Sequence, residues 1–322
     1  MRHAGIDVSK STLSVALLDG EWEAELPNTE AGIQRLVKRL GTMPTRVAIE
    51  ATASYGFDLV DALAQTDDVE VMVINPRASR NFAKATRRRG KTDRGDSHVL
   101  ARFASAMEFT PWTAPSPQAR ELRQLVRRRK QLVDQAASEK RRRKELLSLQ
   151  RPDAFVIETL DANLEHLRKL IARVEAKALQ SAKTDPELDA WRQQLVTTPG
   201  IADVTALCII AELAFLPDNM DGRQLTAYAG LDPQPWQSGQ MDASRRISKR
   251  GNKRLRCALF LAAWNTARFS PHVGAWRDRL LARGKHAKVA DIAVARRLLH
   301  AFAAMRKRGT PWDGDTFHRI SP

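Results

Sequence analysis

The chain has little cysteine and no regular histidine spacing. Its two cysteines, Cys208 and Cys257, lie far apart in the sequence. Neither a disulfide framework nor a thiolate zinc site is therefore expected. The seven histidines are scattered, without the His-x-Glu or His-x-x-x-His spacing of a metal site. Any metal that this chain holds should be bound by oxygen ligands.

Long apolar runs are also missing. No stretch approaches the roughly 20 apolar residues that a membrane span needs. The N-terminal residues Met1–Gly5 lead into a strand-like segment without the apolar core of a signal peptide. Glycine-rich phosphate loops, internal repeats and low-complexity tails are absent from the sequence as well. These absences predict a globular cytoplasmic protein that needs no organic cofactor.

Negative charge is scarce relative to positive charge. The 322 residues include 53 Lys and Arg against 37 Asp and Glu, which gives a formal net charge of +16 and a sequence pI near 10.4. A surplus of this size favours a polyanionic partner, and nucleic acid is the polyanion that we expect. The length indicates about two domains, and the 43% hydrophobic content is enough for packed cores.

The basic residues gather in three clusters that contain almost no acid. In the second cluster, apolar residues recur every three or four positions, which predicts a helix with one packed stripe and a cationic remainder. A charged run is often only a solvated face, but three such clusters favour contacts with phosphate backbones, which bind without reading sequence. The predicted nucleic-acid-binding residues are Arg87, Arg88, Arg89 and Lys91; Arg127, Arg128, Arg129, Lys130, Arg141, Arg142 and Arg143; and Arg245, Arg246, Lys249, Arg250, Lys253 and Arg254.

Four carboxylates lie at the ends of apolar segments in the first hundred residues. Asp7 follows a strand-like run, and Glu50 ends another. Asp93 and Asp96 are three residues apart, so on a helix both can face one point. Hard oxygen ligands of this kind suit Mg²⁺ or Mn²⁺. A single acid at a strand end is more often merely solvated, but the four together predict a metal site, and the first basic cluster would deliver a phosphate to it.

The order of elements predicts a mixed α/β beginning and a helical remainder. Residues 1–112 read as β-β-(β)-α-β-α-β-α, the order of a ribonuclease-H-like fold. The expected strands are near 3–8, 12–18, 22–26, 46–50 and 69–74, and the expected helices are near 30–40, 55–65 and 95–106. Prolines 111, 115 and 117 then break the chain. Two long helices over 118–182, interrupted near Pro152, and a helical domain over 186–322 should follow.

Several motifs, taken in order, resemble one family. The segments Gly5–Lys10, Ile49–Tyr55, Val73–Pro76 and Lys91–Asp96 resemble the DEDD domain of the insertion sequence 110 family of transposases, relatives of the Piv-type DNA invertases. Three later segments resemble the family's C-terminal transposase domain, so the resemblance covers nearly the whole chain. They are Thr198–Ile201, Ala227–Leu231 and Arg246–Asn252.

The resemblance implies an organisation and an activity. It implies a RuvC-like catalytic domain over 1–112, a coiled-coil connector over 118–182 and a transposase domain over 186–322. It further implies site-specific recombination, in which a structured bridge RNA pairs with double-stranded donor and target DNA in the cytoplasm, at the nucleoid. By this likeness the metal ligands are Asp7, Glu50, Asp93 and Asp96, and Ser238 is the nucleophile.

The pattern of residues alone does not select the serine. A loop serine is usually structural, and the residues around Ser238 depart from the family's pattern. A Ser-Gly loop just before the third basic cluster supports it, and metal ions could activate it because no histidine is adjacent. Since serine and acids fall in different domains, we expect a homo-oligomer, dimer to tetramer, with a site assembled between subunits. The other serines near acids or basic clusters are Ser54, Ser97, Ser244 and Ser248.

Two other functions fit parts of the pattern. A RuvC-like Mg²⁺-dependent nuclease or junction resolvase would use water as the nucleophile and would not need Ser238. A non-enzymatic nucleic-acid-binding protein with a decayed ribonuclease-H-like fold is the second alternative, and the four intact acids argue against it. Strand-transfer products would separate a recombinase from a nuclease.

Overall fold

The computed structural model describes residues 1–18, 20, 22–50, 56–86, 93–217, 220–234, 237–238, 241–242 and 246–319. Within these ranges, side chains are not described for residues 93, 94, 234, 237, 238, 241, 242, 246, 316, 318 and 319. The chain divides into two compact units, Met1–Ala114 and Pro115–Pro322. No helix in the described ranges is both long and apolar enough to cross a membrane.

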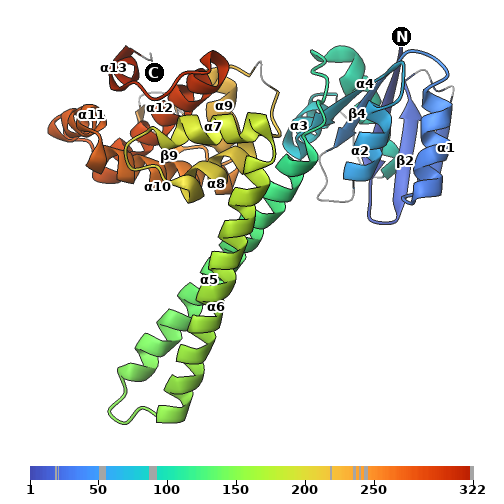
Figure 1. The fold of residues 1–322 in the computed structure, drawn as a ribbon. Coiled ribbons are helices and arrows are strands. Elements are labelled where there is room, and N and C mark those ends of the chain that lie inside the picture. Colours follow the sequence, from blue (N-terminus) through green and yellow to red (C-terminus); the bar gives the residue numbers. More distant parts are fainter. Residues whose placement is uncertain are drawn as a thin grey trace. The chain divides into compact units, whose positions relative to one another are not determined.

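The first unit is built on a five-stranded mixed sheet with the strand order β3-β2-β1-β4-β5 (Figure 1). The first three strands form an antiparallel meander, and β4 and β5 continue the sheet parallel to β1. Most of the strand residues are apolar and buried, as expected for a sheet that is covered on both faces. The strands are β1 (Arg2–Val8), β2 (Thr12–Leu17), β3 (Glu23–Pro27), β4 (Thr45–Glu50) and β5 (Val69–Ile74).

Helices cover both faces of this sheet. On one face, α1 (Glu30–Leu40) and α2 (Phe57–Ala64) pack on alternate residues of the central strands, among them Ile6 and Ile49. On the other face, α3 (Pro76–Ala85) and α4 (Asp93–Ala106) pack on the residues of opposite parity, such as Ala48. The two-residue period of a strand thus sorts each strand's side chains between two helical layers.

A glycine sets the distance between α4 and the sheet. A Cβ atom on Gly5 would lie 2.0 Å from the carbonyl oxygen of Ser97 and 2.3 Å from the backbone nitrogen of Ala101. No side chain fits into that space, so only glycine lets the backbone of α4 lie directly on β1.

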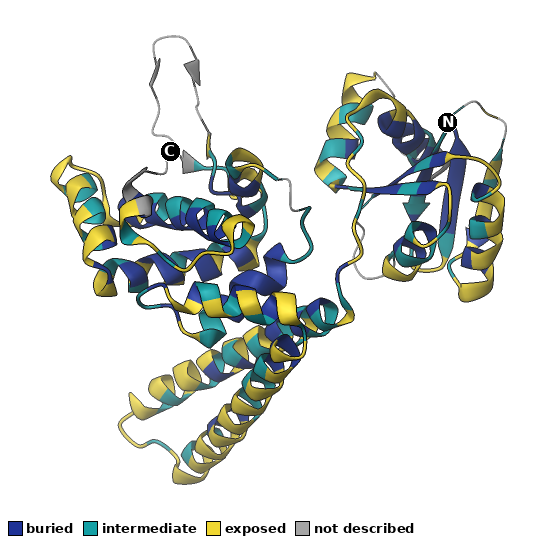
Figure 2. Cartoon of the chain, turned by 45° about the horizontal axis from the view of Figure 1, so that its top comes forward, coloured by how far each residue is buried: buried dark blue, intermediate teal, exposed yellow. Residues whose placement is uncertain are grey.

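The second unit begins with a long helical hairpin of α5 (Pro117–Leu147) and α6 (Ala154–Lys183). Its outer part has a small core of Leu132, Ala136, Leu164 and Leu167. Arg129 and Glu175 form an ion pair across the hairpin at 2.6 Å. The exposed outer faces of both helices are visible in Figure 2.

A helical bundle completes the second unit around a larger apolar core, to which the base of the hairpin contributes. Four short strands lie between α9 and α10: β6 pairs with β9, and β7 pairs with β8, both antiparallel. The helices are α7 (Pro186–Val196), α8 (Asp203–Leu213), α9 (Gly222–Ala229), α10 (Lys253–Phe269), α11 (Pro271–Ala282), α12 (Ala287–Arg308) and α13 (Gly314–Arg319). The strands are β6 (Pro233–Gln234), β7 (Gln237–Ser238), β8 (Met241–Asp242) and β9 (Arg246–Ile247).

The structure confirms the predicted mixed α/β beginning and helical remainder. All five predicted strands and three predicted helices of the first unit are present within a few residues. The prediction missed α3, although Asn75 caps it and Pro76 occupies its first turn, which together are a helix-start signal. The two long helices and their break near Pro152 are also confirmed. The division into three functional domains stays a prediction.

Candidate active site

Two of the predicted carboxylates lie at the carboxyl ends of neighbouring parallel strands. Ile6 of β1 is in register with Ile49 of β4, and Asp7 and Glu50 are the next residues on each strand. Both are half-buried. Because side chains alternate along a strand, each carboxylate shares the sheet face of the residue two positions earlier. For Asp7 that residue is Gly5, on which α4 packs, so the two acids lie on the α4 side of the sheet.

Helix α4 carries the third and fourth predicted acids to the same side. Ser97 is the residue whose carbonyl meets Gly5, and the half-buried Asp96 directly precedes it. Asp93 is the first residue of α4, one turn before Asp96. Its side chain lies outside the described part of the chain. Acids in the first turn of a helix are favoured by the helix dipole.

The donor chemistry of this edge suits a hard divalent cation. All four predicted ligands are carboxylates, the donor type that Mg²⁺ and Mn²⁺ prefer. Among the residues whose side chains the structure describes, no three His, Cys, Asp or Glu side chains form a group that could hold a metal ion. That set contains Asp7, Glu50 and Asp96 but not Asp93. Metal binding at this edge therefore stays a prediction.

A buried serine holds Glu50 in place. The hydroxyl of Ser79, on α3, donates to Oε2 of Glu50 at 2.6 Å. The Ser79 side chain is only 5% exposed. This contact was not predicted, because the sequence analysis did not identify α3. The signal was the Asn75-Pro76 helix start, which places Ser79 one turn inside a helix that follows β5.

A cavity of about 270 Å³ lies between β2, β3 and α4. Ser14, Glu23, Glu25 and Ser97 are among its lining residues. Ser14 is directly opposite Asp7 in the β1–β2 register. The imidazole of His98 lies 2.5 Å from Oε1 of Glu23 and ties α4 to β3. The cavity adjoins Ser14, the strand neighbour of Asp7, but Asp7, Glu50 and Asp96 are not among its lining residues.

Ser238 lies in a short hairpin of the second unit. It belongs to β7 and pairs with Met241 of β8. The flanking strands β6 and β9 also pair, through Pro233 and Ile247, so the chain leaves and re-enters the unit at one place. The side chain of Ser238 lies outside the described part. Its role as a nucleophile is therefore a prediction that the geometry leaves open.

Of the other candidate serines, the structure describes Ser97 and Ser248. Ser97 belongs to α4 and is 1% exposed, so a DNA strand has no access to its hydroxyl. Ser248 donates its hydroxyl to the carboxylate of Asp232 and so helps to fix the start of the loop after β9. Ser54 and Ser244 lie outside the described residues.

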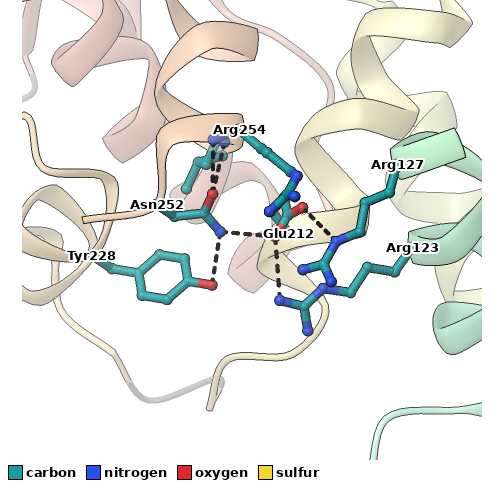
Figure 3. Close-up of polar contacts among 7 residues, drawn as sticks. Arg123, Arg127, Glu212, Tyr228, Asn252 and Arg254 are labelled. Atoms are coloured by element: carbon teal, nitrogen blue, oxygen red, sulfur yellow. Dashed lines mark hydrogen bonds and ion pairs between the residues drawn. The ribbon is translucent and has the colours of Figure 1, made fainter. Parts of the chain in front are cut away.

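A buried carboxylate organises the loop that follows β9 (Figure 3). Glu212 of α8 is 1% exposed, and it accepts a hydrogen bond from Nδ2 of Asn252 at 2.8 Å. Arg123 and Arg127 of α5 approach the same carboxylate at 3.3 and 3.5 Å. The same Asn252 nitrogen also lies 3.1 Å from the hydroxyl of Tyr228. One acid thus joins α5, α8, α9 and the start of α10.

Burial sets the electrostatics of this cluster. It lowers the pKa of the Arg123 guanidinium, although the charge of Glu212 opposes the shift. It also raises the pKa of the Tyr228 hydroxyl. The Asn252 side chain has a second task, because its Oδ1 accepts from the backbone nitrogens of Arg254 and Leu255 and so caps α10. Sequence reasoning missed Glu212, although an acid that follows the apolar run Ala206–Ala211 of α8 was a signal.

The segments around Tyr228 and Asn252 each require a glycine. Gly230 ends α9 in the left-handed region, with φ of 66°. A Cβ on Gly251 would lie 2.0 Å from the carbonyl oxygen of Tyr228. The two segments therefore pack backbone to backbone, and only glycine allows it.

Many cations of the second basic cluster already have acidic partners. Besides the pair of Arg127 with Glu212, Arg129 pairs with Glu175, Lys130 with Asp134, Arg142 with Glu139, and Arg143 with Asp161. Arg128 and Arg141 donate to Gln131 and Ser138. The sequence shows these residues as a nearly acid-free run because three of the five acidic partners lie on other helices: Glu212, Glu175 and Asp161. In the third cluster, Lys249, Arg250, Lys253 and Arg254 are exposed. The first cluster, Arg87, Arg88, Arg89 and Lys91, and Arg245 lie outside the described residues.

Comparison with known families accounts for both units. Residues 4–152 match the transposase family of the DEDD type from IS110 elements. Residues 192–276 match the family described as transposase IS116/IS110/IS902. The chain belongs to this family of transposases. The resemblance seen in the motifs is thereby confirmed, and the family places the chain among enzymes that rearrange DNA.

Its relatives include two pilin gene-inverting proteins and a putative transposase. The pilin gene-inverting protein of Moraxella bovis is 27% identical over 321 residues, which cover 97% of each chain. The pilin gene-inverting protein of Moraxella lacunata shows the same identity and coverage. A putative transposase of Sinorhizobium fredii is 28% identical over 277 residues, covering 73% of this chain and 69% of the relative.

Proposed function

We propose that this transposase is an RNA-guided DNA recombinase, which cuts and rejoins strands through a covalent phosphoserine at Ser238. The observation that carries the proposal is the placement of Asp7 and Glu50 at the ends of two adjacent parallel strands, on the face where α4 begins with Asp93 and continues through Asp96. A meander followed by parallel strands supports a ribonuclease-H-like, RuvC-like domain.

The four carboxylates would hold Mg²⁺, or Mn²⁺ in its place. A bound ion would supply electrostatic stabilisation of the charge that develops on the phosphate. Ser79 would keep Glu50 oriented, because its hydroxyl donates to Oε2 of that carboxylate. Outer contacts of this kind fix the geometry of a ligand without touching the substrate.

The serine step conserves the energy of the broken bond. The Oγ atom of Ser238 would attack the scissile phosphorus, forming a Ser–O–P bond while the P–O bond to the deoxyribose oxygen breaks. The hydroxyl proton leaves Oγ, and the departing oxygen takes up a proton to become a free hydroxyl. A hydroxyl of a second DNA strand can then reverse the step and rejoin the DNA, because a phosphodiester is present throughout.

Nucleic-acid partners would contact the exposed cations of the third basic cluster. We propose double-stranded donor and target DNA and a structured guide RNA as partners, with sequence choice residing in base pairing. We also propose a homo-oligomer, dimer to tetramer, in which serine and acids from different subunits complete each site.

The test compares Ser238→Ala with Asp7→Asn on a DNA substrate with Mg²⁺ and the guide RNA. Both variants should lose strand exchange and retain nucleic-acid binding, since neither change removes a cation. The wild type should form a protein–DNA adduct on a nicked substrate, and peptide mapping should place it on Ser238. Strand exchange by Ser238→Ala, or hydrolytic cleavage without any adduct, would instead favour the water-using nuclease.

A further inference from the structure

A basic groove of about 460 Å³ lies in the second unit, between α5, α8 and α10. Helix α8 packs against both of the other helices, so the groove joins basic residues that are more than a hundred positions apart in the sequence (Figure 1). It combines the second and third basic clusters on one surface. Five cations and two carboxylates line it: Arg127, Arg129, Lys130, Lys253 and Arg254, with Asp134 and Glu212.

The cations of the groove fall into two groups. Those on α5 are paired, as Lys130 is with Asp134 at 2.5 Å. On the α10 side, Lys253 and Arg254 are exposed, and neither has an ion-pair partner among the described residues. They are also the first two residues of α10, where the helix dipole adds positive potential. The groove therefore offers two uncompensated charges at a helix start.

An exposed apolar stripe continues the groove along α10. Leu261 lines the groove and is 56% exposed, and Trp264, one turn further on, is 54% exposed. With Arg254, Cys257 and Arg268 they recur every three or four residues, so they share one face of the helix. Helix α10 contains no Asp or Glu. An exposed aromatic ring about three turns along the same helix face from exposed cations is an arrangement that can stack an unpaired base while the cations hold the backbone of the same strand.

We propose that this groove binds a single nucleic-acid strand, whose phosphates lie on Lys253 and Arg254 and whose unpaired base stacks on Trp264. Charge complementarity favours a polyanion over an apolar protein surface. The exposed indole favours a single strand over a duplex, because bases in a duplex already stack on one another. The site deepens the proposed function because it gives a binding surface to a strand that is separated from its complement. It rests on that function only because it requires nucleic acid as the partner.

The experiment measures equilibrium binding by the full-length Ser238→Ala protein without Mg²⁺, so that no cleavage interferes. The probes are a labelled single-stranded DNA of roughly 16 nucleotides, the RNA of the same sequence, and the matching DNA duplex. Trp264→Ala should weaken binding of a single strand by roughly 5- to 150-fold. Trp264→Phe should restore most of the affinity because the ring is retained. Binding of the duplex should change little with either variant.

The charges are tested by salt dependence. The double change Lys253→Ala and Arg254→Ala should reduce the slope of log affinity against log salt by about 1.4. The matched control changes the exposed Arg283 and Lys285, between α11 and α12, to Ala and should leave the single-strand slope close to that of the wild type. The DNA and RNA arms show which strand the groove prefers, and single-strand binding that depends on Trp264 in either arm supports the proposal.

Three results would overturn it. One is equal binding of the single strand by Trp264→Ala and the wild type. Another is a loss of duplex affinity on Trp264→Ala as large as the loss for the single strand. A change in oligomeric mass on Trp264→Ala with unchanged nucleic-acid affinity would assign the stripe to a second copy of the chain. None of these depends on strand exchange, so they are distinguishable from a failure of the Ser238 mechanism.

Discussion

The Glu212→Gln substitution removes one negative charge from the interior of the second unit and keeps the size of the side chain. The glutamine carbonyl can still accept from Asn252, as Oε2 does now at 2.8 Å. The charges of Arg123 and Arg127, however, lose the only carboxylate that approaches them in the described part of the chain. The new amide N–H₂ group would also face guanidinium groups that can only donate.

The magnitude follows from burial. Removing one partner of a buried ion pair costs about 3–5 kcal/mol. The Arg123 and Arg127 side chains are 17% and 35% exposed, and water can partly solvate them, so we expect the low end, about 3 kcal/mol. For a unit of about 200 residues each kcal/mol shifts Tm by about 2–4 °C. The melting temperature of the second unit should therefore fall by about 6–12 °C.

Differential scanning calorimetry of the full chain measures this fall. The control is Glu165→Gln, which removes a carboxylate of α6 in the same unit that is 53% exposed and pairs with Arg168 and Lys169. Exposed pairs contribute about 0–1 kcal/mol, so the control should melt within about 4 °C of the wild type. A Glu212→Gln protein that melts as the control does would show that the cluster is not a stabilising element, and the reasoning would fail.

Three further predictions concern single contacts. Gly5→Ala should destabilise the first unit by several kcal/mol because its Cβ would overlap the backbone of α4; limited proteolysis should cut that unit faster and leave the second unchanged. Ser79→Ala should reduce strand cleavage by roughly 10- to 100-fold, with a shifted Mg²⁺ dependence, and Ser79→Thr should restore part of it; unchanged metal dependence would argue against orientation of Glu50. Burial lowers the pKa of the His300 imidazole, so its contribution to stability is present above about pH 6.5 and lost as the pH falls below that value. His300→Gln should accordingly lose less Tm than the wild type between about pH 7.5 and pH 5, and an equal loss would exclude His300 as a source of acid sensitivity.

Local sequence rules predicted most of the first unit. The runs that became β1, β4 and β5 are short and rich in Val, Ile and Ala between polar segments, so their length and composition sufficed. Helix α1 has its Thr29 cap and an apolar spacing that continues to Leu40. The same rules would have located α3 had its Asn-Pro start been weighed. Whether a segment forms a strand or a helix therefore follows from its own residues.

Long-range partners were beyond these rules. The run from Arg127 to Lys130 contains no acid, yet Glu175 and Glu212 reach it from other helices. The groove between α5 and α10 likewise depends on how helices pack, because its two basic edges come from separate clusters. A pattern in one segment shows which side chains are charged, but only the fold shows which charges remain uncompensated.

Both units hold a motif residue through a polar side chain from a distant element. In the first unit Ser79 of α3 binds Glu50 at the end of β4. In the second, Glu212 of α8 binds Asn252 at the start of α10. A surface acid or a helix cap with such a partner loses rotamer freedom before any substrate arrives, so less entropy is lost when the site is formed. Preorganisation of this kind predicts that the partner residues affect activity through orientation, and the conservative changes Ser79→Thr and Asn252→Asp test it. Ser79→Thr keeps a hydroxyl donor, so activity should be largely retained. Asn252→Asp keeps the α10 cap but places a second carboxylate against Glu212 in place of a donor. It should therefore lower activity more than Asn252→Ala, which only removes the hydrogen bonds.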